Sequence, residues 1–163
     1  MGIMIALPCH GGIVNEKTTM SLFNLGKLLV RNGIPHGLFT QANSSLITHG
    51  RSKCANFFIN NTDHEYLFFL DSDIGFNPED VLKLLSHNEP IVSGTYPMKT
   101  IPIRYCVDVL QPEERRGDLL KVGGNGMGFV MIHRSVFTDI AQKFPYLKYV
   151  PSTKDSNYPP TEA

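Results

Sequence analysis

A continuous apolar run, Tyr-Leu-Phe-Phe-Leu at residues 66–70, constrains the fold of this chain more than any other feature. Five aromatic and aliphatic residues without a polar break are typical of a strand that is buried on both faces. Such a strand lies inside a sheet that helices cover on both sides. The run therefore predicts the centre of an α/β domain, and the residues after Leu70 are expected at the carboxyl end of a buried strand.

Asp71-Ser72-Asp73 follows this strand directly. Open α/β sheets bind their ligands outside the carboxyl ends of the strands. If the extended geometry continues, Asp71 and Asp73 point to the same side and Ser72 points away. Two such carboxylates repel each other unless a cation lies between them or one is protonated. Hard oxygen ligands favour manganese or magnesium (Mn²⁺ or Mg²⁺), which usually arrive with phosphates. The segment thus predicts a site for a metal-bound nucleoside diphosphate, and a strand-end turn is the structural alternative.

Short apolar strands alternate with amphipathic helices along the chain. We expect strands at 3–7, 34–40, 66–70, 91–95 and 129–132, and helices at 18–32, 47–60, from 78 onward and at 136–144. Pro8 closes the first strand, Ser21 lies on the polar face of the first helix, Gly33 ends that helix, a charged turn covers 111–118, and Ser135 caps the last helix. Strands separated by helices indicate parallel pairing, and the later strands indicate a mixed sheet.

Composition narrows the class of protein. The 163 residues suit one domain, expected at 1–150, with 151–163 as a loop or disordered tail. Lys+Arg and Asp+Glu are both 15, which gives no support for a nucleic-acid partner. No apolar stretch approaches the roughly 20 residues of a transmembrane segment. The three cysteines are dispersed and form neither a zinc spacing nor a disulfide framework, so we expect a cytoplasmic protein.

Arg51 falls on the apolar stripe of the second helix, together with Cys54, Ala55 and Phe58. An arginine in such a place costs free energy unless its charge is paired. Two interpretations are open. Arg51 forms a salt bridge with an acid at the edge of the core, or it contacts the diphosphate or base of a bound nucleotide.

With these elements in place, the chain resembles the nucleotide-sugar-dependent glycosyltransferases of the GT-A fold, which carry an Asp-x-Asp motif. The resemblance covers residues 3–144 and is nearest to small single-domain enzymes of viral or bacterial type. The matching features are Leu70–Ile74 after the buried strand, Pro8–Gly11 after the first strand, Arg51, Ser93–Pro97, and the glycine-rich Gly124–Ile132. It implies a Rossmann-like, mixed and mostly parallel sheet flanked by helices.

The resemblance also implies an activity and a site. The enzyme would move a sugar from a nucleotide-diphosphate donor, a UDP-sugar before a GDP-sugar, to a hydroxyl of a glycan or glycolipid acceptor. Asp73 would bind the metal directly, and Asp71 through water or the ribose. The donor would be held by Pro8, His10, Gly11, Arg51, Asp71, Ser72 and Asp73. The cleft for the sugar and acceptor would be lined by Tyr96, Lys99, Gly124, Asn125, Gly126 and Met127.

Plainer structural roles stand beside these assignments. In this alternative, the loop after the first strand is an ordinary strand-to-helix turn and Gly123–Gly128 is a bulged segment leading into a strand. Tyr96 and Lys99 are then exposed loop residues. The family usually continues with an acidic residue near the acceptor and a final metal-binding His or Asp. No such segment precedes Ala163, so we expect either a truncation point with the catalytic base beyond Ala163, or other residues in these roles.

Two further functions are weighed against the transferase. A sugar nucleotidyltransferase needs a glycine-rich, basic phosphate loop after its first strand, and residues 8–14 hold no Lys or Arg. A catalytically incomplete nucleotide-sugar-binding module would have the same binding site but no acidic residue near the acceptor.

Overall fold

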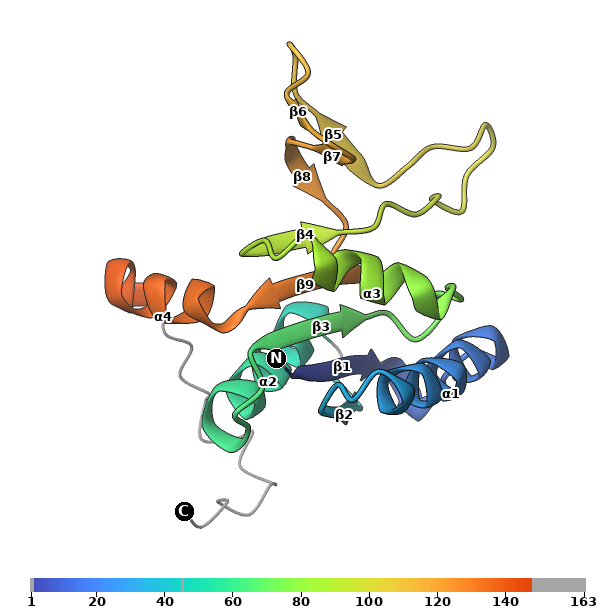
Figure 1. The fold of residues 1–163 in the computed structure, drawn as a ribbon, viewed down its shortest axis with the longest axis vertical. Coiled ribbons are helices and arrows are strands. Elements are labelled where there is room, and N and C mark those ends of the chain that lie inside the picture. The colour runs from blue at the N-terminus through green and yellow to red at the C-terminus, as the bar shows by residue number, and fades with distance from the viewer. Residues whose placement is uncertain (1, 45, 148–163) are drawn as a thin grey trace.

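A five-stranded sheet in the order β2-β1-β3-β9-β4 lies at the centre of the fold (Figure 1). The structure is a computed structural model, and it describes residues 2–44 and 46–147. The strands are β1 (Ile3–Cys9), β2 (His36–Ala42), β3 (Tyr66–Leu70), β4 (Ile91–Ser93) and β9 (Phe129–His133). β2, β1 and β3 pair in parallel, and β9 runs antiparallel between β3 and β4. The predicted mixed, mostly parallel α/β sheet is confirmed.

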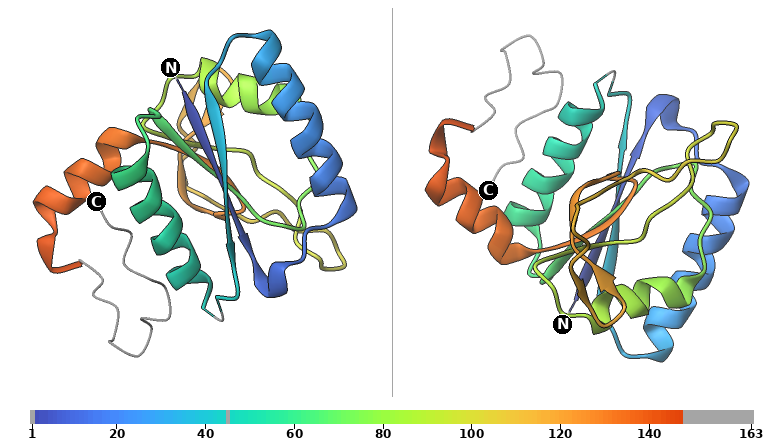
Figure 2. Two further views of the ribbon diagram at one scale, coloured as in Figure 1. Left: turned by 90° about the horizontal axis from the view of Figure 1, so that it is seen from below. Right: turned by 90° about the horizontal axis from the view of Figure 1, so that it is seen from above.

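Helices cover both faces of this sheet (Figure 2). They are α1 (Glu16–Arg31), α2 (Ile47–Asn61), α3 (Pro78–Ser86) and α4 (Arg134–Lys143), with short 3-10 turns η1 (His10–Gly12) and η2 (Pro145–Leu147). Helices α1 and α3 pack on one face through Leu25, Leu29 and Val81. Helix α2 packs on the other face through Cys54 and Phe58, and Phe137 of α4 joins it.

The strands supply both hydrophobic cores because their side chains alternate. Along β1, Ile3, Ile5 and Leu7 belong to the core under α1 and α3, whereas Met4 and Ala6 belong to the core under α2. All five residues of β3 are buried, as the apolar run predicted. The hydrophobic cores on both faces of the sheet therefore hold the carboxyl end of β3 in place.

Two small sheets follow β4 and stand apart from the main sheet (Figure 1). Strand β5 (Val107–Val109) pairs with β8 (Val122–Asn125), and β6 (Arg115–Arg116) pairs with β7 (Leu119–Leu120), both antiparallel. Residues 111–118, expected as a charged turn, contain strand β6. Arg115 and Arg116 pair there with Leu120 and Leu119 of β7, for which no strand was predicted.

Several predicted boundaries are wrong by a few residues, for local reasons. Strand β1 continues through Pro8 to Cys9, because β3 pairs with it only as far as Ala6 and a proline is tolerated beside a single neighbour. Helix α1 starts at Glu16, where the Asn15 side chain accepts a hydrogen bond from the amide of Lys17. Strand β2 is shifted two residues toward the carboxyl end.

The last helix is capped by a different residue from the one expected. Helix α4 begins at Arg134, and the His133 ring nitrogen accepts a hydrogen bond from the Ser135 amide. Ser135 therefore lies inside the helix. Gly33 does follow α1 with φ of 63°, as predicted for the residue after a helix end. The tail expected at 151–163 lies outside the described residues.

Among residues 2–44 and 46–147, no helix has both the length and the apolar character needed to cross a bilayer.

Candidate functional site

Three segments that the sequence singled out meet at one edge of the sheet. The carboxyl ends of β1, β3 and β4 share this edge, and antiparallel β9 begins there. The turn η1 follows β1, Asp71–Asp73 follows β3, and Gly126–Gly128 leads into β9. This is the edge at which open α/β sheets bind ligands.

Asp71-Ser72-Asp73 lies in a tight turn. Strand β3 ends at Leu70, and the Ile74 amide donates a hydrogen bond to the Asp71 carbonyl at 3.2 Å. The strand alternation that we expected for Asp71 and Asp73 therefore does not apply. The two carboxylates contact different cations, one from helix α2 and one from the segment after β4.

Asp71 pairs with Arg51. An Nη2 hydrogen of Arg51 is donated to Asp71 Oδ1 at 2.8 Å, and the side chains are 21% and 29% exposed. The salt-bridge interpretation of Arg51 is thus what the structure contains, and its acid is the first residue of the Asp-x-Asp motif. The Nε of Arg51 is buried and has no partner among the described residues. A contact between Arg51 and a nucleotide stays a prediction.

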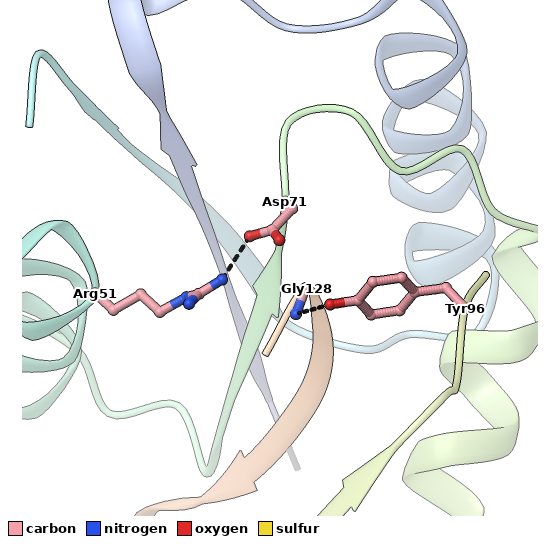
Figure 3. A network of polar contacts seen from close by, with 4 residues as sticks. All are labelled: Arg51, Asp71, Tyr96 and Gly128. Atoms are coloured by element: carbon pink, nitrogen blue, oxygen red, sulfur yellow. Dashed lines mark hydrogen bonds and ion pairs between the residues drawn. The ribbon is translucent and has the colours of Figure 1, made fainter. Parts of the chain in front are cut away.

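Gly128 holds the other side of Asp71 (Figure 3). The Asp71 amide donates to the Gly128 carbonyl at 2.9 Å, and the Gly128 amide donates to the Tyr96 hydroxyl oxygen at 3.1 Å. A Cβ atom on Gly128 would lie 2.6 Å from Asp71 Oδ2, 2.7 Å from Ile74 and 2.8 Å from the Tyr96 oxygen. Only glycine allows the three chain segments to approach this closely.

Tyr96 stays protonated at this site. Burial raises the pKa of its hydroxyl, and the negative charge of Asp71 and the Cys106 thiol act in the same direction, while the Gly128 amide opposes them. A protonated tyrosine beside a carboxylate can donate a hydrogen bond as well as accept one. Tyr96 can therefore orient a hydroxyl or phosphate oxygen near Asp71.

Asp73 pairs with Lys99 near the surface. The Lys99 ammonium donates to Asp73 Oδ2 at 2.7 Å, and the side chains are 86% and 53% exposed. The pair raises the pKa of Lys99, chiefly through this hydrogen bond. Because exposed ion pairs contribute little to stability, a stronger cation can displace the lysine from Asp73.

A divalent cation at these carboxylates would need further oxygen ligands, such as those of a substrate. The described residues hold no group of three or more His, Cys, Asp or Glu side chains placed to bind a metal. Mg²⁺, however, is commonly held by one or two carboxylates together with substrate phosphates and water. Asp73, already in contact with a cation, has the right chemistry for this partial site, and Asp71 lies two residues away.

Helix α1 and its cap residue Asn15 support the Asp-x-Asp turn. The Asn15 amide donates to the Ser72 carbonyl at 2.8 Å. The Ser21 hydroxyl donates to the Phe76 carbonyl at 2.7 Å and accepts from the Phe76 amide at 3.0 Å. Ser21, expected on the polar face of α1, is in fact buried, because it satisfies the backbone beyond the turn. Pro8 lies in β1, while His10 and Gly11 lie exposed in η1.

The first part of the glycine-rich segment forms strand β8, and the rest leads into β9. Gly124 and Asn125 belong to β8, whose pairing with β5 has a register shift at Gly123. The segment therefore contains a bulge, as the structural alternative predicted, but the bulge lies in the pairing of β8 with β5. The Asn125 amide donates to the Ser93 hydroxyl, while Asn125 Oδ1 is buried without a partner among the described residues.

Tyr96 lies beside the end of the glycine-rich segment, while the cleft expected for the sugar and acceptor stays a prediction. A Cβ atom on Gly126 would lie 2.2 Å from the Tyr96 oxygen and 2.7 Å from the Cys106 sulfur. Met127 is 37% exposed. A cavity of about 460 Å³ is lined by Tyr96 together with Ile74, Ser93 and Phe129, but not by Lys99 or by residues 124–127, which were expected in the same cleft.

The sequence predicted no role in the site for Asn15 and Ser21, and it marked Ser93 only as part of the matching segment Ser93–Pro97. Asn15 could have been found as a helix cap, since it precedes the charged first turn of α1. The contacts of Ser21 with Phe76 and of Ser93 with Asn125 had no local signal, because the partners are 55 and 32 residues apart.

Comparisons with known proteins bear on the fold. No protein-family model and no curated protein matches the sequence. The crystal structure of A197 from STIV matches with a TM-score of 0.58 and 23% identity, over 86% of this chain and 69% of that one. A 4-diphosphocytidyl-2C-methyl-D-erythritolsynthase from Anaerococcus prevotii matches with a TM-score of 0.49 and 8% identity, over 94% and 81%.

A third structure is a glycosyltransferase involved in the glycosylation of the major capsid of PBCV-1, with a TM-score of 0.42 and 13% identity over 91% of this chain and 70% of that one. The match to A197 shows that this chain shares its fold.

Proposed function

We propose that this chain is a metal-dependent glycosyltransferase that takes a sugar from a nucleotide-diphosphate donor, with a UDP-sugar favoured. One observation carries the proposal: Asp71 and Asp73 follow a buried strand at the ligand-binding edge, and a basic side chain lies on each carboxylate. A site with two carboxylates and two cations suits a diphosphate that arrives with a metal ion.

Each residue has a distinct role in this proposal. Arg51 and Gly128 fix Asp71, so that its free lone pairs can orient a ribose hydroxyl or a metal-bound water. Tyr96 donates its hydroxyl hydrogen to an oxygen of the substrate. Lys99 leaves Asp73 and lies against the diphosphate, which offers it a stronger anionic partner.

Asp73, with Asp71, would hold the Mn²⁺ or Mg²⁺ ion. A bound divalent ion would neutralise the charge that develops on the departing nucleoside diphosphate. Acceptor activation needs a base, and none of the described residues is assigned to it. The acceptor proposed for the site is a hydroxyl of a glycan or glycolipid.

Thermal unfolding with and without ligand tests the proposal. A ligand at a hundred times its Kd adds about 2.7 kcal/mol to the free energy of unfolding, or roughly 5–10 °C in Tm for a chain of this size. We expect UDP with Mn²⁺ to produce such a shift, GDP a smaller one, and UDP with a chelator little. Release of UDP from a UDP-sugar then separates an enzyme from a binding module.

Asp73→Ala should remove the metal-dependent shift. Glu114→Ala is the matched control, because Glu114 forms another exposed ion pair, with Lys121 at 2.9 Å. Lys99→Ala frees Asp73 and should lower the Mn²⁺ concentration that stabilises the protein in the absence of nucleotide, but it should weaken the stabilisation by UDP, because it removes the proposed partner of the diphosphate. If no nucleoside diphosphate stabilises the protein with either metal, or if Asp73→Ala behaves like Glu114→Ala, the proposal is wrong.

A further inference from the structure

The segment between β4 and β5 folds back on itself as a hairpin. Pro97 pairs with Tyr105, and the Met98 amide donates a hydrogen bond to the Arg104 carbonyl at 2.7 Å. We call residues 97–105 the apolar hairpin. In Figure 1 it is the olive loop that projects beyond α3, away from the five-stranded sheet.

The tip of the apolar hairpin exposes large hydrophobic side chains. Ile101 is 101% exposed and Ile103 70%, with Tyr105 at 58% and Met98 at 40%. Single exposed hydrophobic residues are common on protein surfaces and need no explanation. Four large apolar side chains within nine residues are a patch, and such a patch marks an interaction site. Their exposure costs free energy in water, and another apolar phase would remove that cost.

The charge of the apolar hairpin has one sign. It contains Lys99 and Arg104 and no Asp or Glu. Among the described residues, no carboxylate pairs with Arg104. Lys99 pairs with Asp73, and the cations around β6 and β7 also have acidic partners, such as Arg115 with Glu113 and Lys121 with Glu114, so Arg104 is the cation that the hairpin presents. The hairpin therefore presents apolar side chains beside the Arg104 cation, and a bilayer with anionic headgroups matches both features.

We infer that the apolar hairpin docks on an anionic lipid surface. Ile101 and Ile103 enter the boundary between headgroups and acyl chains, and Arg104 contacts lipid phosphates. Tyr105, which is apolar at its ring and polar at its hydroxyl, suits the level of the headgroups. The hairpin holds the protein at the membrane surface, with the five-stranded sheet outside the bilayer.

Docking would place the candidate site at the membrane. Lys99 belongs to the apolar hairpin and contacts Asp73, so the Asp-x-Asp turn lies at the base of the docked segment. This identifies a lipid-linked hydroxyl as the class of acceptor. That consequence rests on the proposed function, whereas the docking itself does not.

Sedimentation with vesicles, without nucleotide or metal, tests the docking. The full chain should bind vesicles that contain phosphatidylglycerol and bind pure phosphatidylcholine more weakly. Ile101→Ser with Ile103→Ser should lower the partition coefficient by about tenfold or more. Arg104→Glu should cause a loss of about tenfold on the anionic vesicles, since each basic residue near such a surface adds to binding. Val30→Ser with Leu38→Ser is the matched control, because these residues are 69% and 56% exposed elsewhere on the protein.

A single tryptophan reports where the tip lies. The chain has none, so Ile101→Trp supplies the only indole. Its emission should shift to the blue with anionic vesicles and be quenched by brominated acyl chains, while Val30→Trp shows neither effect. The inference is overturned if the wild-type chain ignores anionic vesicles, or if the Ile101 and Ile103 double variant binds them like wild type. Vesicle binding without a thermal shift from UDP and Mn²⁺ would leave the docking in place and remove the proposed function.

Discussion

At the scale of single residues, the site depends on how closely the backbone can approach Asp71. Gly128 lies between Asp71, Ile74 and Tyr96, and any side chain there would meet all three. Arg51 then fixes one oxygen of the carboxylate. The sequence marked Asp71, Arg51 and the glycine-rich segment separately. Their mutual contact gives each of them its position.

Gly128→Ala should therefore damage both stability and ligand binding. A methyl group 2.6 Å from Asp71 Oδ2 forces backbone or side chains apart, and we predict a loss of about 1–3 kcal/mol in the free energy of unfolding. The stabilisation by UDP and Mn²⁺ should fall as well. Urea unfolding and thermal shift measure the two effects.

Gly124→Ala serves as the control for this variant, because its Cβ would meet only the Asp108 side chain, at 3.8 Å. It should unfold like wild type. Equal effects of the two substitutions would contradict the crowding argument.

His64 should make the stability of the protein depend on pH. Burial lowers the pKa of His64, Arg134 and His36 lower it further, and Asp63 opposes them. The unfolded chain, with a histidine pKa of about 6.5, then takes up the proton first as the pH falls. The contribution of His64 is complete above that pKa and is lost as the pH falls through the lower, folded value.

We thus predict that the urea midpoint of the wild-type chain drops between pH 7.5 and pH 5.5, and that His64→Gln drops less. The slope with pH is the readout, not the absolute stability of the variant. Identical slopes would show that His64 does not titrate differently on folding.

At the scale of elements, helix ends and strand ends decide the local geometry. Helix α2 carries Arg51, and its carboxyl end is held by Arg134 of α4. The Arg134 guanidinium donates to the carbonyls of Phe58, Ile59, Thr62 and His64 at 2.6–3.1 Å and lies 4.2 Å from the Phe58 ring centroid. One side chain thus joins the last helix to the second and satisfies carbonyls that a helix end leaves without partners.

Arg134→Met should lower the free energy of unfolding by about 2–4 kcal/mol, since several carbonyls lose their donor and the Phe58 ring loses its cation. Arg134→Lys should recover less than half of this loss, because one ammonium cannot reach carbonyls that the planar guanidinium serves together. Urea unfolding measures both variants.

Arg115→Ala is the matched control, since its exposed pair with Glu113 should be worth less than about 1 kcal/mol. If Arg134→Met unfolds no earlier than Arg115→Ala, the capping role is wrong.

At the scale of the whole molecule, one sheet unites two cores. β1, β3 and β9 each send alternate side chains to opposite faces, so neither core can melt while the strands stay ordered. The periodicity of the sequence predicted the strands and helices well, because burial is repeated locally. It did not predict that β9 pairs between β3 and β4, since strand order depends on the path of the whole chain.

The protein should consequently unfold in one cooperative transition. Phe58→Ala leaves a cavity in the core under α2. Phe68→Ala leaves a cavity in the core under α1 and α3, where Phe68 packs against Phe76 and Phe129. Each should cost about 3–5 kcal/mol. Far-ultraviolet circular dichroism and tyrosine fluorescence should give coincident urea curves in both variants. A curve that splits in one variant alone would mean that the two cores are independent.

The sequence by itself determined the buried strand at 66–70, the alternation of strands and helices, and the position of Asp71 and Asp73 at a carboxyl edge. Local periodicity contains that information, because each residue's burial shows in its neighbours. Only the tertiary structure decided which cation meets which carboxylate. The pairs Arg51–Asp71, Lys99–Asp73 and Tyr96–Gly128 are separated by 20, 26 and 32 residues. Such contacts follow from the packing of the complete chain. The structure also decided between the extended geometry and the strand-end turn that the sequence left open at Asp71–Asp73, in favour of the turn.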